Sequence, residues 1–262
     1  MLKYIMAAAT LLLLHCSSSN TSEHAAQSAK SEDMMEAAAL PTSDGGVPQL
    51  SKEELTGRFV PASHPDFVRV GTPYTSKSGM MLRRDAYNAF KKMWEAAKKD
   101  GISLKIISST RNFDQQKNIW EDKWRRYAKE TPDPQQRALR ILEYSSMPGT
   151  SRHHWGTDID LNDLNNSAFE QGGAHKKVYD WLSKHASEYG FGQPYTPKGE
   201  ARPHGYNEEK WHWSYLPLAQ PYRIAYLATV NEKDINGFAG AETAVPLKVV
   251  ERYVGGVGKA CQ

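Results

Sequence analysis

The sequence predicts a domain of the α+β class, in which helices pack against a few short strands. Three observations lead to this prediction. Apolar residues recur at helical spacing within 86–97, apolar and polar residues alternate within 102–107, and the aromatic segment 211–215 resembles the return strand of a hairpin. Short strands separated by helices favour this class.

The first predicted helix has an apolar stripe over residues 86–97, and Gly101 is expected to end it. Its apolar stripe consists of Ala86, Ala89, Phe90, Met93, Trp94 and Ala97. We interpret this stripe as a buried core face, since apolar residues at this spacing line one side of a helix. The predicted strand 102–107 follows and places Arg111 after its end, before a helix that contains Trp120, Trp124 and Tyr127.

The later elements are marked by prolines and glycines. Asp133-Pro134 is typical of a helix start, and the predicted helix runs through Leu142. Residues 151–161 are expected to form a loop and then a strand, because Pro148-Gly149 breaks the chain before them. A further helix carries Val178, Trp181, Leu182, Ala186 and Tyr189 and ends at Gly190. Residues 249–254 favour a last helix, which either packs on the domain or forms a surface extension.

The N-terminal residues predict export. Residues 1–16 read as a signal peptide, because Ile5 to Leu14 is an apolar run of ten residues, too short for a bilayer core of about 30 Å. Leu13-Leu14-His15-Cys16 resembles a bacterial lipobox, in which Cys16 would be lipidated, although His15 stands where a small residue is usual. The alternative is secretion after cleavage nearby. Either way we expect the protein in the bacterial cell envelope, facing the periplasm or the cell wall.

Composition divides the rest of the chain. Residues 17–58 contain no aromatic residue and read as a disordered tether. Residues 59–230 suit one domain, and 231–262 are expected to be a C-terminal extension. The only cysteines, Cys16 and Cys261, exclude a disulfide framework. The net charge of +3 is not gathered into a basic helix or stripe, so we expect no nucleic-acid partner. We also expect a monomer.

Two segments carry the chemistry of a zinc hydrolase. Residues 151–160 read Ser-Arg-His-His-Trp-Gly-Thr-Asp-Ile-Asp, and residues 209–213 read Glu-Lys-Trp-His-Trp. A catalytic Zn²⁺ usually takes three protein ligands and leaves one position for water, whose proton a nearby carboxylate can accept. Spacing alone does not choose between His153 and His154, or between Asp158 and Asp160. Read singly, these segments could also be a polar turn and a strand with a buried histidine.

The segments resemble the Ser-x-His-x-x-Gly-x-Ala-x-Asp and Glu-x-Trp-His motifs of the zinc D-Ala-D-Ala carboxypeptidases, the VanY and VanX type of LAS-type peptidoglycan peptidases. The resemblance implies that His153, Asp160 and His212 are zinc ligands. It also implies that Glu209 is the catalytic base and that Ser151 contacts the substrate. The fold implied is a small antiparallel sheet that carries the zinc site and is packed with helices, as in Hedgehog and the DD-peptidases.

A third segment, residues 109–116, resembles the family's Tyr-Arg-Ser-x-x-x-Gln element. By this resemblance Arg111 binds a substrate carboxylate or the developing oxyanion, and Gln116 lines the same cleft. Two residues depart from the family pattern. Asp158 replaces a small residue and could orient a ligand histidine or alter substrate preference, and Lys210 replaces a common proline. Of the remaining histidines, only His204 is close enough in sequence to be a cleft candidate.

The resemblance implies a zinc-dependent carboxypeptidase that hydrolyses the terminal D-Ala-D-Ala bond of peptidoglycan stem peptides. L,D-carboxypeptidase, D,D-dipeptidase and cell-wall endopeptidase activities remain open, as does a non-catalytic peptidoglycan-binding module. A serine peptidase is disfavoured because the chain has no Ser-x-x-Lys or Gly-x-Ser-x-Gly motif.

Overall fold

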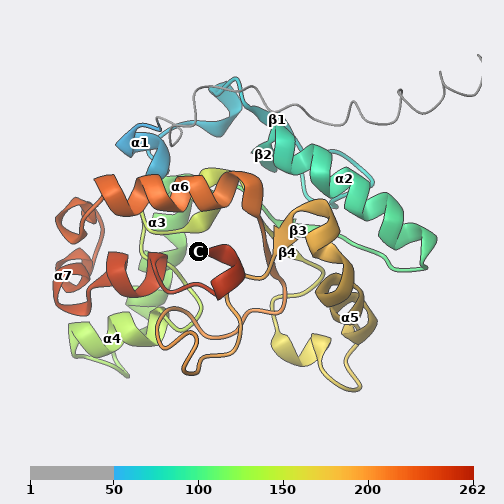
Figure 1. The fold of residues 1–262 in the computed structure, drawn as a ribbon. Coiled ribbons are helices and arrows are strands. Elements are labelled where there is room, and N and C mark those ends of the chain that lie inside the picture. The colour runs from blue at the N-terminus through green and yellow to red at the C-terminus, as the bar shows by residue number, and fades with distance from the viewer. Residues whose placement is uncertain (1–49) are drawn as a thin grey trace, which may run out of the picture. The chain divides into compact units, whose positions relative to one another are not determined.

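The computed structural model describes residues 50–262 and has the predicted α+β fold (Figure 1). Its helices are α1 (Lys52–Leu55), α2 (Arg84–Lys99), α3 (Phe113–Tyr127), α4 (Pro134–Ile141), α5 (Lys176–His185), α6 (Leu216–Thr229) and α7 (Ala244–Leu247). Its strands are β1 (Phe67–Arg69), β2 (Met81–Arg83), β3 (Ile106–Ser108), β4 (Asp158–Leu161), β5 (Phe191–Gly192) and β6 (His212–Tyr215). The signal peptide expected at 1–16, the lipidation site Cys16 and most of the expected tether lie outside the described residues.

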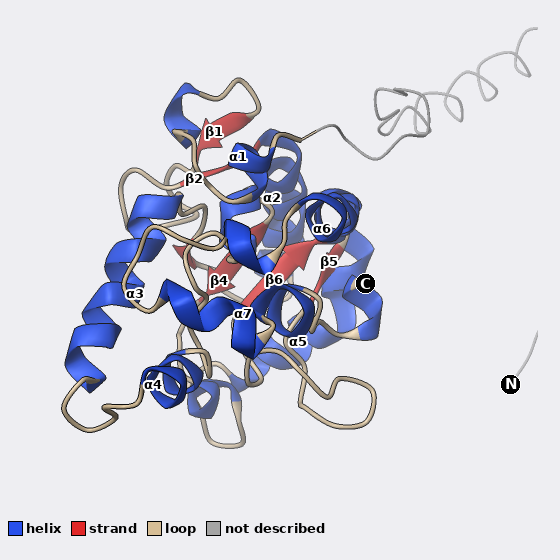
Figure 2. Cartoon of the chain, turned by 90° about the vertical axis from the view of Figure 1, so that its left-hand side faces the viewer, coloured by secondary structure: helices blue, strands red, loops and turns tan. Residues whose placement is uncertain are grey.

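The central sheet has four strands in the order β3-β4-β6-β5, and every neighbouring pair is antiparallel. The two middle strands align Asp158 with Ser214 and Asp160 with His212. Figure 2 shows these strands inside a surround of helices. The expectation of a small antiparallel sheet packed with helices is therefore confirmed.

Two apolar clusters hold the sheet and helices together. One lies on the side of α2 and α5 and contains Phe90, Ile159 and Trp213. The other contains Trp120 and Tyr226, from α3 and α6, together with α4, α7 and the C-terminal residues. In Figure 1 α2 and α5 lie on one side of the sheet, and α3, α4 and α7 lie on the other.

The helices fall close to where apolar spacing and prolines predict them. Asp133 caps the start of α4 by accepting a hydrogen bond from the backbone N–H of Gln136 at 2.8 Å. After α5, a 3₁₀ helix (Ala186–Tyr189) ends at Gly190, whose φ of 78° lies in the left-handed region. None of the described helices is long and apolar enough to cross a membrane.

The strand predicted at 102–107 is shorter than expected, because β3 begins only at Ile106. The side chain of Asn162 forms hydrogen bonds with the backbone just before Ile106. Its Oδ1 accepts a hydrogen bond from the Lys105 N–H at 3.1 Å, and its Nδ2 donates to the Ser103 carbonyl at 2.9 Å. These backbone groups are thus satisfied by an amide side chain rather than by a neighbouring strand.

The packed part of the chain extends beyond the expected limits of 59 and 230. At the N-terminal end, α1 buries Leu55 completely, and the Leu55 carbonyl accepts a hydrogen bond from the Trp155 indole at 3.1 Å. At the C-terminal end, Val249, Val254 and Val257 are fully buried in the apolar cluster that contains Trp120 and Tyr226. The segment 231–262 is therefore part of the domain core, and its expected helix is a short π-helix (Val250–Val254).

Candidate metal centre

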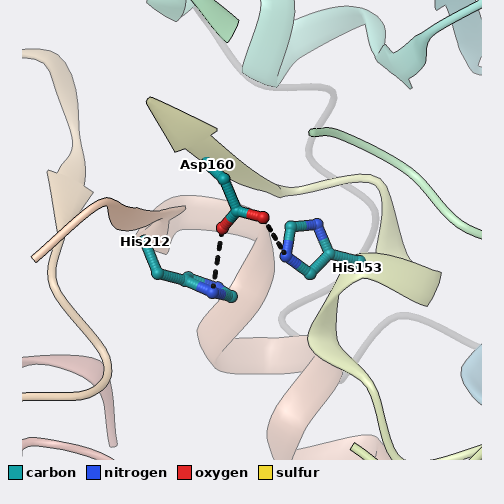
Figure 3. Close-up of side chains that lie close together, drawn as sticks. All are labelled: His153, Asp160 and His212. Carbon is teal, nitrogen blue, oxygen red and sulfur yellow. Dashed lines mark ion pairs between the residues drawn. The ribbon is translucent and has the colours of Figure 1, made fainter. Parts of the chain in front are cut away.

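Two adjacent strands and the loop before them bring His153, Asp160 and His212 together. His153 lies in a 3₁₀ helix (Arg152–Trp155), Asp160 on β4 and His212 on β6. One oxygen of Asp160 is 3.4 Å from His153 Nε2, and the other is 3.3 Å from His212 Nδ1 (Figure 3). All three residues are buried, and one candidate ligand atom from each lies within 4.8 Å of the other two. Two imidazole nitrogens and one carboxylate oxygen fit a zinc ion that keeps a fourth position open.

The hydrogen-bond partners of His153 and His154 show which of the two rings can bind a metal ion. His153 donates from Nδ1 to the Ser109 carbonyl at 2.8 Å, which leaves Nε2 free for a metal ion. In His154 both nitrogens are occupied, since Nδ1 donates to the Arg111 carbonyl at 2.6 Å and Nε2 accepts from the Gly149 N–H at 3.1 Å. Burial lowers the pKa of His154 to about 3. His154 is thus a neutral structural residue that links its 3₁₀ helix to the backbone at Arg111 and Gly149.

The hydrogen-bond partners of Asp158 likewise distinguish it from Asp160. Asp158 Oδ1 accepts a hydrogen bond from His212 Nε2 at 2.9 Å, so the Nδ1 atom of that ring faces the metal position. Arg152 donates from Nε to the same oxygen at 3.0 Å, and Thr157 donates to the other oxygen at 2.5 Å. Burial by itself would raise the pKa of Asp158, but the Arg152 guanidinium and His212 hold it below its usual range. Asp158 is therefore placed to orient His212, one of the two roles expected for it.

Sequence reasoning missed Arg152, which is 1% exposed and is the counter-ion of Asp158. It also donates to the hydroxyl of Ser214, which lies opposite Asp158 on β6. A buried carboxylate at an unusual position signals that a cation must lie nearby, but the sequence does not say which one.

Glu209 lies beside His212 at the candidate metal centre and is 5% exposed. Its Oε2 is 3.1 Å from His212 Nδ1. The backbone holds it there, because the Glu209 N–H donates to the Tyr195 carbonyl at 3.0 Å and the Gln193 amide donates to the Glu209 carbonyl at 3.2 Å. Burial raises the pKa of the carboxyl. A carboxylate with a raised pKa beside a metal position suits a general base.

Arg111 also lies beside Asp160, with Nη1 3.8 Å from Oδ2, the oxygen that is nearest to His153. It is fixed by hydrogen bonds to Gln116 Oε1 at 2.9 Å and to the Ser108 hydroxyl at 2.5 Å. Gln116 in turn donates to the Ser146 carbonyl at 2.9 Å. Burial lowers the pKa of Arg111, while Asp160 and Glu209 act in the opposite direction. The guanidinium is thus held rigidly beside the candidate metal ligands.

A cavity of about 440 Å³ is lined by the three candidate ligands His153, Asp160 and His212 together with Glu209, Arg111 and Gln116. Ser151 also lines it, and its hydroxyl is buried without a partner among the described residues. The cavity wall includes further residues that sequence reasoning did not select: Lys123, Tyr144, Tyr195, Tyr206 and Trp211. His204 is exposed and does not line the cavity.

A buried cluster of two histidines and an aspartate, with a glutamate beside it in a cleft, defines the class of metal-dependent hydrolase sites. The family model described as "VanY: D-alanyl-D-alanine carboxypeptidase" matches residues 79–218, which include every residue of this cluster. The chain belongs to this family.

Two curated relatives agree with this membership. The Bacillus subtilis (strain 168) protein YodJ, which carries a carboxypeptidase name, is 33% identical over 137 residues, 52% of this chain and 46% of that protein. A D-alanyl-D-alanine carboxypeptidase of Enterococcus faecalis (strain ATCC 700802 / V583) is 26% identical over 148 residues, 55% of this chain and 52% of that protein. The match thus spans about half the length of these relatives.

Solved structures include similar chains at lower sequence identity. VanYB in complex with D-alanine-D-alanine has a TM-score of 0.46 and 22% identity, over 61% of this chain and 88% of that chain. A mutant of the vancomycin resistance D,D-pentapeptidase VanY in complex with Zn(II) has a TM-score of 0.45 and 21% identity, over 67% of this chain and 93% of that chain.

Proposed function

We propose that this protein is a zinc-dependent carboxypeptidase that hydrolyses the terminal D-Ala-D-Ala bond of peptidoglycan stem peptides. The observation that carries the proposal is the position of Glu209, a buried carboxylate 3.1 Å from His212 and open to the cleft. A site that only bound a ligand would have no use for a base beside its metal. Membership of a D-alanyl-D-alanine carboxypeptidase family supports the choice of bond.

His153, Asp160 and His212 would hold the zinc ion. When bound, the ion supplies Lewis acidity, which polarises a carbonyl group and makes water a stronger acid. His153 and Asp160 are presented in fixed orientations by the Ser109 carbonyl and by strand β4, and Asp158 does the same for His212. These supports engage one nitrogen of each ring and leave the other facing Asp160, where the ion would bind.

The other cleft residues handle the proton and the substrate. Glu209 accepts a proton from the attacking water and returns it to the amine that leaves. Arg111 stabilises the negative charge that develops on the scissile carbonyl oxygen or binds the peptide carboxylate, because its guanidinium is fixed beside the metal ligands. Ser151, whose buried hydroxyl has no partner among the described residues, and Gln116 contact the bound peptide.

Peptidoglycan as substrate requires a protein that reaches the cell envelope. The apolar run at Ile5 to Leu14 and the lipobox-like Cys16 support export with an N-terminal lipid anchor, facing the periplasm or the cell wall. A monomer suffices for this activity, since all the residues named for the site come from one chain.

Mass spectrometry of a pentapeptide muropeptide, incubated with the zinc-loaded protein with and without a chelator, tests the proposal. We expect the loss of one alanine, abolished by the chelator. Loss of a dipeptide or cleavage at another bond would replace the proposed specificity by that of a dipeptidase, an L,D-carboxypeptidase or an endopeptidase. Binding of the muropeptide with no change in its mass would favour a peptidoglycan-binding module.

A further inference from the structure

Helix α3 places a second cation in the cleft, beyond the residues that the family motif supplies. Gln116 and Lys123 are seven residues apart, about two helical turns, so they lie on the same face of α3. Both line the cavity. Lys123 Nζ donates to the hydroxyl of Ser145 at 2.5 Å, and the next residue, Ser146, accepts the hydrogen bond from Gln116. Lys123 therefore belongs to the cavity wall that also fixes Arg111.

Lys123 differs from the other cations of α3 in its partners. Lys117 is paired with Glu121, and Arg125 and Arg126 are paired with Asp122. In the part of the chain that the structure describes, no carboxylate lies within ion-pair distance of Lys123, whose Ser145 partner is a neutral hydroxyl. Burial lowers the pKa of its ammonium group, and the positive charges of Arg126 and Arg111 add to this effect, while the more distant carboxylates of Glu209 and Asp122 act in the opposite direction. A bound anion would compensate for both.

The charges of the cleft divide by position. The carboxylates Asp160 and Glu209 lie at the metal centre, where Arg111 already accompanies them. Lys123 lies further along α3, at a part of the wall formed by serines. A peptide bound with its scissile bond at the metal centre can thus direct a carboxylate toward this lysine.

We propose that Lys123 forms a carboxylate-binding subsite, so that the cleft prefers peptides that place a carboxylate group there. The proposal rests on the proposed peptidase function. Two parts of a stem peptide carry this chemistry: the C-terminal carboxylate of the last D-Ala, and a carboxylate on the third residue, as in meso-diaminopimelate. Lys123 binds the carboxylate through a charge-assisted hydrogen bond, and Ser145 steadies the ammonium group.

Binding to a catalytically silent protein tests the subsite without turnover. Calorimetric titrations would use zinc-loaded full-length Glu209→Ala protein, with and without Lys123→Met. The ligands are diacetyl-L-Lys-D-Ala-D-Ala, the same peptide with a C-terminal amide, and the same peptide with meso-diaminopimelate in place of lysine. We expect Lys123→Met to weaken binding about tenfold to a hundredfold only for ligands that carry the recognised carboxylate.

The pattern of losses identifies the source. If Lys123 binds the C-terminal carboxylate, Lys123→Met weakens both acids and leaves the amide unchanged. If it binds the carboxylate of the third residue, only the meso-diaminopimelate peptide is affected. Lys123→Arg should keep most of the affinity. Arg125→Ala, a matched loss of charge on the same helix at a residue whose side chain is 70% exposed, should change nothing.

Unchanged affinity of Lys123→Met for all three peptides would overturn the subsite and leave the proposed function intact. Conversely, wild-type protein that binds the peptides with this dependence on Lys123 but leaves their mass unchanged would contradict the peptidase function alone. Failure of the Glu209→Ala protein to bind any of the three peptides would contradict both.

Discussion

Two pairs of neighbouring residues in the first motif divide into proposed ligands and supports. His153 and His154 are adjacent, yet one leaves a ring nitrogen free beside Asp160 while the other uses both nitrogens to hold backbone groups. Asp160 faces the two ring nitrogens, whereas Asp158 lies behind the ring of His212. Because alternate residues of a strand share a face, only hydrogen-bond partners distinguish the two aspartates.

The support that Asp158 gives to His212 can be measured. We predict that Asp158→Ala weakens zinc binding about tenfold to a hundredfold, because the ring loses the acceptor that orients it. Competition with a chelator of known affinity measures this change. Asp180→Ala, a charge loss on α5 at a side chain that is 57% exposed, is the control and should leave zinc affinity unchanged. Equal affinity of Asp158→Ala and wild type would show that Asp158 does not orient the ligand.

Zinc affinity should also depend on pH through His212. Burial would lower the pKa of this ring, but hydrogen bonds to Asp158 and Glu209 outweigh it and raise the pKa to about 9 in the metal-free protein. A zinc ion on Nδ1 must displace the proton of the imidazolium. Below pH 9 the affinity should therefore fall about tenfold for each pH unit. Chelator competition at pH 6, 7 and 8 measures the slope, and an affinity that does not change with pH would contradict this prediction.

The residues of the site were predictable to different degrees. The inventory of histidines and carboxylates and the family resemblance led to His153, Asp160 and His212, which the structure brings together. The pairing of Arg152 with Asp158 was not predictable, because it depends on a short helical turn that folds the chain back on itself. Lys123 was missed for a different reason: a lysine on an amphipathic helix usually faces solvent, and the sequence does not show that this one lines a cavity.

At the scale of elements, the turn at Gly156 connects His153 to the strand that carries Asp160. Gly156 has φ 74°, a conformation that favours glycine. A Cβ atom at this position would lie 2.3 Å from the ring of Phe67. The carbonyl of Gly156 also accepts a hydrogen bond from the backbone N–H of Arg83 at 2.9 Å. The β1-β2 hairpin thus packs directly against the turn that connects two of the proposed metal ligands.

We predict that Gly156→Ala lowers the free energy of unfolding by about 2 to 5 kcal/mol, from left-handed backbone strain and from overlap with Phe67. Urea denaturation measures the loss. Gly79→Ala is the matched control, because Gly79 has φ 77° but open space around the Cβ position. It should cost only the strain of about 1 to 2 kcal/mol. Equal losses in the two variants would contradict the role given to Phe67.

Helices and strands were predictable where local patterns dominate. The stripe of 86–97 and the Asp133-Pro134 start correspond to α2 and α4. The strand at 102–107 was predicted too long, because Asn162, which is distant in sequence, binds the backbone at Ser103 and Lys105. Alternation of residue types carries no information about such a long-range partner.

At the scale of the whole molecule, segments from both ends of the described chain complete the core. Leu55 from α1 and Val254 from the C-terminal region belong to the same apolar cluster as Trp120 of α3. Composition did not predict this, because residues 50–58 resemble the polar segment before them and 231–262 carry no long apolar stripe. Burial of their few apolar residues depends on partners that come from the centre of the chain.

Removal of residues 231–262 should therefore abolish cooperative folding, because it exposes the apolar faces of α3 and α6. Thermal unfolding followed by circular dichroism tests this expectation. As a milder test, Val254→Ala should lower the free energy of unfolding, because Val254 is fully buried. Val245→Ala is the control. Val245 is 52% exposed, so its replacement should change the free energy of unfolding by no more than about 0.5 kcal/mol. A truncated protein with a single wild-type-like transition would contradict the inclusion of 231–262 in the core.

The central claim is that His153, Asp160 and His212 hold a zinc ion while Glu209 acts as the base. The most direct test measures bound zinc and peptide turnover together, in the wild type and in Glu209→Ala. We predict one zinc ion in each protein and a loss of turnover of about a hundredfold to ten-thousandfold in the variant, because only the proton transfer is removed. Turnover near the wild-type rate in Glu209→Ala, or wild-type protein that binds no zinc, would contradict the account.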